Sequence, residues 1–282
     1  YKGYVAMQRE RLGSRLGFIL LSAGCAIGVG NVWKFPWMVG QYGGGAFVVF
    51  YVLFLIILGL PIMTMEFAVG RASQKSAARS FHVLEPAGTK WHLQGYACMA
   101  GNYLLMMFYT TVGGWMAAYI FKTLTGEFKG LDSDGVAAVF NDMLARPGYM
   151  TFWMVLVVLL SFFICSLGLQ KGVERITKAM MSCLFLILLI LCIRSVTLPG
   201  ASEGLRFYLI PDFTRFTENG VGNTIFAAMG QAFFTLSLGI GAMAIFGSYI
   251  GKDRTLTGET ISICLLDTLV AFLAGLIIFP SC

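Results

Sequence analysis

Residues 24–36 of the chain read GCAIGVGNVWKFP, and this stretch decides the fold. It interrupts the first apolar segment with Gly24, Gly28 and Gly30, followed by an asparagine, a lysine and a proline. Glycine in a helix interior costs about 1 kcal/mol relative to alanine. We therefore expect a helix of about two turns up to Ala23, and then a break in the backbone.

The composition indicates a polytopic membrane protein. Of the 282 residues, 57% are hydrophobic and 12% are charged, whereas a soluble domain has about 25% charged residues. The net charge is +6, but the basic residues gather at segment ends, which is typical of membrane topology and not of nucleic-acid binding. The seven cysteines lie scattered in apolar runs without a CxxC pair, so we expect them to pack in the interior.

An apolar segment needs about 17–25 residues to cross a bilayer. Seven such segments are centred approximately on residues 16–40, 44–69, 95–122, 151–169, 177–198, 223–250 and 259–280. No small-residue cleavage site follows the first of them, so we do not expect a signal peptide.

Lysine and arginine set the expected orientation. The N-terminal tail and the loops after the second, fourth and sixth segments hold 13 of these residues, against seven elsewhere. Cytoplasmic loops carry the excess of positive charge. The pattern predicts a multi-pass protein of the plasma membrane with a cytoplasmic N-terminus and long outer loops at 123–150 and 199–222.

A second break falls in the sixth segment, where residues 230–241 read GQAFFTLSLGIG. Small residues also allow transmembrane helices to pack closely, which is the simpler interpretation of either cluster alone. Both clusters, however, combine glycine with side-chain oxygens, and an open backbone in hydrocarbon must be satisfied by protein, water or a ligand. Paired interrupted segments are typical of transporters that bind their substrate and ions near the middle of the bilayer, and leucine-transporter-type proteins are among the examples of this rule.

At these residues the sequence resembles the neurotransmitter:sodium symporter family, in particular its bacterial amino-acid transporters. The resemblance covers essentially the whole chain and rests on RLGFILLSAGCAIGVGNVWKFP (15–36), GGGAF and GLPIMTMEFAVGR within 43–71, KGVERITKAMM (171–181) and QAFFTLSLGIGA (231–242). It implies an all-α inverted-repeat helix bundle of the leucine-transporter type, with unwound first and sixth helices. Residues 1–282 would form one transmembrane domain, with a first five-span repeat at 1–198 and the start of a second repeat at 199–282. Because the family has eleven or twelve spans, the remainder of the second repeat is expected to be missing from this chain.

The resemblance also implies a substrate site. The carboxylate of an amino-acid substrate would bind the amides of Val29 and Gly30 and the hydroxyl of Tyr109, as suits the positive end of a half-helix. Its ammonium group would face the carbonyls of Ala26, Phe234 and Thr235 and the Ser237 hydroxyl. The substrate side chain would lie against Leu105, Tyr109, Phe234 and Ile240. Ile240 is aliphatic where small-substrate members often have a bulky aromatic residue, so we expect hydrophobic or aromatic amino acids as substrates.

Two sodium sites are implied as well. The first would use Ala26, Asn31, Thr235 and Asp267, and the second would use the carbonyls of Gly24 and Ile27. These hard oxygen donors favour an alkali cation over a transition metal.

Asp267 lies in an otherwise uncharged span, where a carboxylate costs several kcal/mol unless it is paired. Chloride-dependent members have asparagine at the matching position. We therefore expect that chloride is not required; the alternative is a structural ion pair of Asp267 with a lysine or arginine.

Gate residues match less closely. Arg9 resembles the inner-gate arginine and Tyr249 the tyrosine near it. Lys34 stands where many members have the outer-gate arginine, and lysine lacks the planar bidentate fork of arginine. Glu66 is expected to be structural.

The predicted function is sodium-coupled amino-acid symport into the cell by alternating access, and the protein is not expected to be an enzyme. A sensor or receptor of the same fold remains the alternative, and both a monomer and a homodimer are open. A seven-span G-protein-coupled receptor conflicts with the charge asymmetry. An ion channel stays open as an alternative, and saturable sodium-dependent uptake with a fixed stoichiometry would separate a carrier from a pore. His82 and His92 fall in the loop between the second and third segments, where we expect a solvated or structural role.

Overall fold

The computed structural model describes residues 15–218, 220–251 and 254–282, with only the backbone at 169–171, 216 and 218. In these ranges the chain is helical, and its one β-type pairing is an isolated bridge between Gly44 and Pro211. Contacts divide the chain into two compact units. The larger unit consists of Tyr1–Met99 with Glu174–Cys282, and the smaller of Ala100–Val173.

The helices before the smaller unit are short because glycine and proline interrupt them. They are α1 (Arg15–Ala26), η1 (Gly30–Lys34), α2 (Phe35–Gln41), α3 (Gly45–Phe54), η2 (Leu55–Gly59), α4 (Leu60–Ser73) and α5 (Ala77–Leu84). The elements η1 and η2 are single π-helical turns, and α3, η2 and α4 together form one apolar run from Gly45 to Ser73.

The long helix α6 (His92–Leu124) leads from the larger unit into the smaller one. The smaller unit continues with α7 (Ser133–Leu144), α8 (Pro147–Ser166) and most of the π-helical η3 (Leu169–Glu174). The chain then returns to the larger unit with α9 (Arg175–Val196), α10 (Ala201–Leu209), α11 (Phe213–Glu218), α12 (Val221–Thr235), α13 (Ala242–Gly247), α14 (Leu256–Ile278) and η4 (Phe279–Ser281).

Five helical segments of the described chain are long and apolar enough to cross a membrane, and α1 with η1 and α2 makes a sixth if the bent pair counts as one span. The sixth predicted span, 223–250, is divided between α12 and α13. The expected count of seven therefore stays a prediction.

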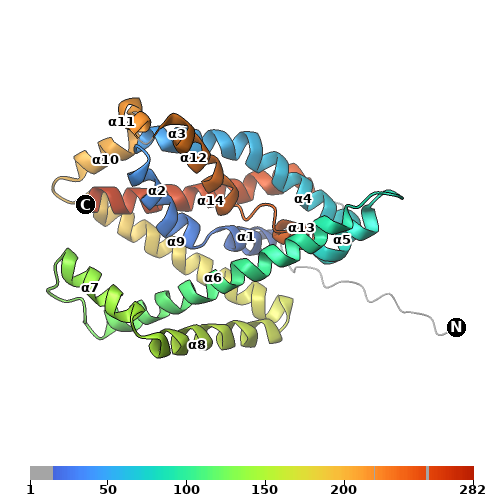
Figure 1. Ribbon diagram of the computed structural model, residues 1–282, viewed down its shortest axis with the longest axis horizontal. Helices are drawn as coiled ribbons and strands as arrows, with labels where there is room; N and C mark the ends of the chain where they lie inside the picture. The colour runs from blue at the N-terminus through green and yellow to red at the C-terminus, as the bar shows by residue number, and fades with distance from the viewer. Residues whose placement is uncertain (1–14, 219, 252–253) are drawn as a thin grey trace. The chain divides into compact units, whose positions relative to one another are not determined.

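Helix α14 runs through the centre of the larger unit, where it packs against α9, α1, α4, η1 and α2 (Figure 1). Helix α13 packs on α4, and glycines make that close approach possible. A methyl group added at Gly70 would overlap the Ala244 carbonyl oxygen, and one at Gly247 would lie 2.5 Å from the Phe67 carbonyl oxygen. The first interrupted helix thus lies beside α14, and the second packs on α4 and α3.

Candidate functional site

The first predicted break is present. Helix α1 ends at Ala26, three residues later than expected, so that Gly24 lies in its last turn. The chain then bends by 54° between Arg15–Ala26 and Gly30–Gln41. The amides of Asn31 and Val32 both donate to the Gly28 carbonyl, at 3.1 and 3.3 Å. In the π-helical turn that follows, the Phe35 amide donates to the Gly30 carbonyl. A helix end leaves carbonyl oxygens without intrahelical partners, and these are available to a cation or a donor.

The second predicted break is also present. Helix α12 ends at Thr235, and α13 begins only at Ala242. Ser237, Gly239 and Gly241 all have positive φ, at 53°, 84° and 74°. Glycine adopts this region freely, whereas a serine there is strained. The backbone therefore leaves the helical path at this point and does not merely bend.

Asp267 of α14 joins the two breaks. Its side chain is 0% exposed. The Asn31 amide donates to its Oδ1 at 2.8 Å and to its backbone carbonyl at 3.1 Å. The Thr235 hydroxyl donates to Oδ2 at 3.0 Å. Three of the four residues predicted for the first sodium site are thus brought together by direct contacts.

The donors that reach Asp267 are neutral. In the described ranges none of the ion pairs between side chains includes this carboxylate. A buried carboxylate without a counter-charge is costly, because hydrogen bonds replace only part of its hydration. Among the described residues, therefore, nothing supports a structural ion pair of Asp267 with a lysine or arginine.

Further hydrogen bonds connect the breaks to each other and to α4. The Ser237 hydroxyl lies 3.4 Å from the Cys25 carbonyl oxygen at the end of α1. The Gly239 amide donates to Oε1 of Glu66 at 2.6 Å. Glu66 therefore supports the second break, in agreement with the structural role expected for it.

Gln231 was not expected as part of the site, although the sequence GQAFFT shows its polarity. It is 1% exposed, and its Nε2 donates to the Gly30 carbonyl at 3.0 Å. Tyr51 of α3, also buried, lies within electrostatic reach of Asp267 and was missed as well. A tyrosine in an apolar run gives no signal of such a position.

Phe234 and Gly30 lie in close contact. A methyl group on Gly30 would lie 3.0 Å from the Phe234 ring, so glycine allows the two helices to approach here. The Lys34 ammonium lies 3.8 Å from the centre of the same ring, a cation–π distance. The predicted outer-gate lysine is therefore placed over a predicted substrate-binding residue.

The other predicted residues are placed as follows. Ala26 and Ile27 are buried in the first break, with Val29 beside them, and Ile240 lies in the second break. Gly24 faces α9, where a methyl group would meet Thr177 and Met181. Tyr249 follows α13, while Leu105 and Tyr109 lie on α6 in the smaller unit. Arg9 lies outside the described residues, so its gate role stays a prediction, as do the roles of Leu105, Tyr109 and Tyr249.

The sequence of the chain matches a known protein family. The family profile described as "Sodium:neurotransmitter symporter family" matches residues 9–132 and 133–281. An uncharacterized sodium-dependent transporter of Bacillus subtilis, YhdH, is 39% identical over 95% of this chain and 58% of its own length. The sodium- and chloride-dependent GABA transporter 2 of Mus musculus is 29% identical over 97% of this chain and 50% of its own length.

A solved structure agrees with the fold. The crystal structure of MhsT in complex with L-phenylalanine has a TM-score of 0.87 and 40% sequence identity, and it matches 97% of this chain and 61% of that chain. The predicted leucine-transporter-type fold is thereby confirmed. The chain spans about half to three fifths of the length of these relatives.

Proposed function

The chain belongs to the sodium:neurotransmitter symporter family, and we propose that the protein couples sodium influx to the uptake of a hydrophobic or aromatic amino acid. The observation that carries the proposal is the buried Asp267 carboxylate, held by Asn31 and Thr235 from two separate helix breaks. The family is one of transporters and not of enzymes.

Sodium is the cation that this chemistry favours. The available donors are a carboxylate, an amide oxygen, a hydroxyl and main-chain carbonyls, which suit a hard cation. The carbonyl end of α1 adds the negative end of a helix dipole at Ala26. In the proposed mechanism, sodium neutralises Asp267 and replaces the donors that now hold it. A second sodium at the carbonyls of Gly24 and Ile27 is part of the same proposal.

Coupling between sodium binding and substrate binding follows from neighbouring residues that serve both proposed sites. Thr235 contacts Asp267 through its side chain and immediately follows Phe234, which touches Gly30. An amino acid whose carboxylate binds the amides at Val29 and Gly30 would therefore require the geometry that sodium stabilises. Binding of one would favour binding of the other, and the two breaks supply points where the half-helices can reorient in alternating access.

The substrate proposal has two supports. Ile240 is smaller than an aromatic residue at a position proposed to line the pocket, and the MhsT structure contains L-phenylalanine. We propose that chloride is not required, because Asp267 supplies a fixed negative charge beside the cation. The protein would lie in the plasma membrane with its N-terminus in the cytoplasm.

The test uses the full-length protein in proteoliposomes. Uptake of labelled phenylalanine, leucine and glycine is measured in sodium or N-methylglucamine, with chloride or gluconate as the anion. We expect sodium-dependent uptake of phenylalanine and leucine above that of glycine, unchanged in gluconate. Uptake that ignores sodium would refute the symport proposal, and loss of uptake in gluconate would refute chloride independence. Saturable sodium-dependent binding without uptake would instead identify a sensor.

A further inference from the structure

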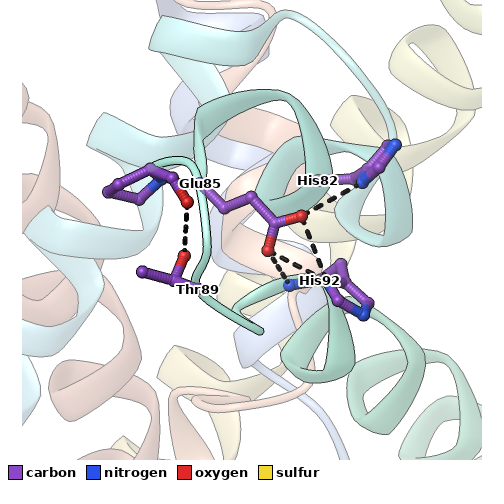
Figure 2. A network of polar contacts seen from close by, with 5 residues as sticks. His82, Glu85, Thr89 and His92 are labelled. Carbon is purple, nitrogen blue, oxygen red and sulfur yellow. Dashed lines mark hydrogen bonds and ion pairs between the residues drawn. The ribbon is translucent and has the colours of Figure 1, made fainter.

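His82, Glu85 and His92 form a compact cluster outside the transport site (Figure 2). His82 lies in the last turn of α5, Glu85 follows that helix, and His92 begins α6. One potential ligand atom from each residue lies within 4.8 Å of the others. The three residues belong to the larger unit, and neither histidine takes part in the proposed transport mechanism.

Both imidazole rings direct the same atom at the Glu85 carboxylate. Nδ1 of His82 lies 3.3 Å from Oε1 of Glu85, and Nδ1 of His92 lies 3.0 Å from Oε1 and 2.9 Å from Oε2. The His92 amide also donates to Oε2 at 3.0 Å. This hydrogen bond caps the N-terminus of α6 and fixes the position of the Glu85 carboxylate, as supporting hydrogen bonds do for metal-binding carboxylates.

A short turn holds the cluster together. The Thr89 hydroxyl and amide both donate to the Pro86 carbonyl, at 2.8 and 3.1 Å, and Gly88 adopts a φ of 85°. The turn brings His92 back to Glu85 after seven residues. Capping of α6 requires only Glu85 and the His92 amide, so it does not explain why the His82 ring also points at the carboxylate.

We propose that His82, Glu85 and His92 bind a divalent transition metal, in the first instance Zn²⁺. Two histidines and one glutamate form a known zinc ligand set, with a further position left for water. Ligands about 2.1 Å from a tetrahedral ion lie about 3.4 Å from one another. The donor–acceptor distances of 2.9–3.3 Å are close to that separation. A metal can therefore replace the protons shared with Glu85 at nearly the present separations, while the two histidine nitrogens, which lie within 4.8 Å of each other, would move toward the ion.

Exposure of the residues fits an accessible site. The side chains of His82 and His92 are 72% and 34% exposed, and that of Glu85 is 14% exposed. Water can therefore complete the coordination, and a metal can enter without opening the fold. The nitrogen ligands distinguish this site from the all-oxygen sodium sites, because imidazole prefers zinc and its neighbours over alkali cations.

The position of the site links it to the second helix break. A methyl group at Gly241 would lie 2.7 Å from Ala77 of α5, and the Cys98 thiol of α6 donates to the Gly239 carbonyl at 3.3 Å. A metal between His82 and His92 would tie together the two helices that touch residues 239–241.

The test is metal binding by the full-length protein, purified without a histidine tag. Zn²⁺ affinity is measured by calorimetry, and Co²⁺ substitution is followed by visible absorption, which reports nitrogen and oxygen ligation. We expect H82Q and H92Q each to weaken Zn²⁺ binding more than about tenfold, since losing even a supporting partner commonly costs that much. Zn²⁺ should also raise the Tm of the native protein, because it binds the folded state.

Two variants separate ligation from folding. E85Q retains an oxygen that can cap α6 but loses the ligand charge, so it should fold normally and bind Zn²⁺ weakly. K90Q changes an exposed charge in the same loop without removing a ligand, and it should bind as the native protein does. The proposal is overturned if H82Q, whose side chain is mostly exposed, binds Zn²⁺ with native affinity, or if the native protein shows no Co²⁺ spectrum. Neither readout depends on transport.

Discussion

The side chains of Asn31 and Asp267, 236 residues apart in the chain, meet in a buried hydrogen bond of 2.8 Å. The Thr235 hydroxyl reaches the second oxygen of the same carboxylate. One carboxylate on a continuous helix thus positions the broken ends of two others. A cation bound at this carboxylate would therefore change the contacts of both helix breaks at the same time.

The first prediction concerns these two donors. Asn31 and Thr235 are also proposed to ligate sodium through their side-chain oxygens, and the loss of even a supporting partner at a metal site commonly lowers metal affinity about 10–100-fold. We expect Asn31→Ala and Thr235→Val each to raise the sodium concentration for half-maximal substrate binding by about tenfold or more. Scintillation proximity binding at varied sodium measures this.

Thr268→Val is the matched control, because the Thr268 hydroxyl donates to the Cys264 carbonyl of its own helix at 2.7 Å. Its sodium dependence should equal that of the native protein. The double variant Asn31→Ala/Thr235→Val should fall short of the product of the single effects, since both donors serve one carboxylate. Full additivity would contradict a shared site.

Gln231 gives a second prediction. Its Nε2 donates to the Gly30 carbonyl, while its Oε1 is buried without a hydrogen-bond partner among the described residues. Gln231→Met should weaken substrate binding a few-fold, because one neutral hydrogen bond contributes about 1 kcal/mol. Gln231→Glu should weaken it more, since a carboxylate would face the Gly30 carbonyl without a donor.

At saturating substrate, the Gln231→Met variant should need the same sodium concentration for half-maximal substrate binding as the native protein. A shift of the sodium requirement as large as that of Asn31→Ala would show that Gln231 acts at the cation site and not through Gly30.

Much of this site could be predicted from the sequence, because its chemistry depends on residue types that are unusual in a membrane span. Glycine clusters beside Asn31 and Thr235 indicated the two breaks, and the lone carboxylate at 267 indicated a costly buried position, whereas its proposed role at a sodium site came from the family resemblance. The sequence could not show that α1 continues to Ala26, because the glycine at 24 packs against α9 and is tolerated inside the helix.

Contacts between distant residues were beyond sequence reasoning. His82 and His92 looked like separate loop residues, since a turn of defined geometry between them leaves no periodic signal. Gln231 and Tyr51 gained their positions from the packing of α12 on α3 and on the first break, which no local pattern encodes. Hydropathy counts each broken helix as one continuous segment, and the count of seven spans stays a prediction.

Lys34 and Phe234 give a third prediction. A cation over an aromatic ring contributes about 0.5–2 kcal/mol. If this contact closes the outer side of the substrate site, Lys34→Gln and Phe234→Leu should each speed dissociation of bound substrate by about 2–30-fold. Dissociation of labelled substrate after dilution into sodium buffer measures the rate.

Lys34→Arg should retain the native rate, because guanidinium groups also stack on aromatic rings. The two disrupting changes act on one contact, so their combination should be no faster than the stronger single variant. Dissociation at the native rate in Lys34→Gln would show that the cation–π contact plays no part in retention.

The packing of α4 on α13 gives a fourth prediction. A methyl group at Gly70 would overlap the Ala244 carbonyl oxygen, and backbone cannot move aside as a flexible side chain can. Gly70→Ala should therefore destabilise the protein by about 3 kcal/mol or more. Gly230→Ala in α12 meets nothing within 4 Å and should be neutral or slightly stabilising. Thermal unfolding in detergent compares the two; equal Tm values would contradict the close packing.

Ser237 gives the last prediction, because it combines strain with function. Its φ of 53° lies in the left-handed region, which costs a residue with a side chain about 1–2 kcal/mol. Ser237→Ala keeps that strain and loses the hydroxyl, whereas Ser237→Gly loses both. Both variants should bind substrate more weakly, since the hydroxyl that faces Cys25 is also the proposed partner of the substrate ammonium. Ser237→Gly should nevertheless have a higher Tm than Ser237→Ala, equivalent to about 1 kcal/mol. If alanine is as stable as glycine here, the break is not strained, and the serine is retained for its hydroxyl alone.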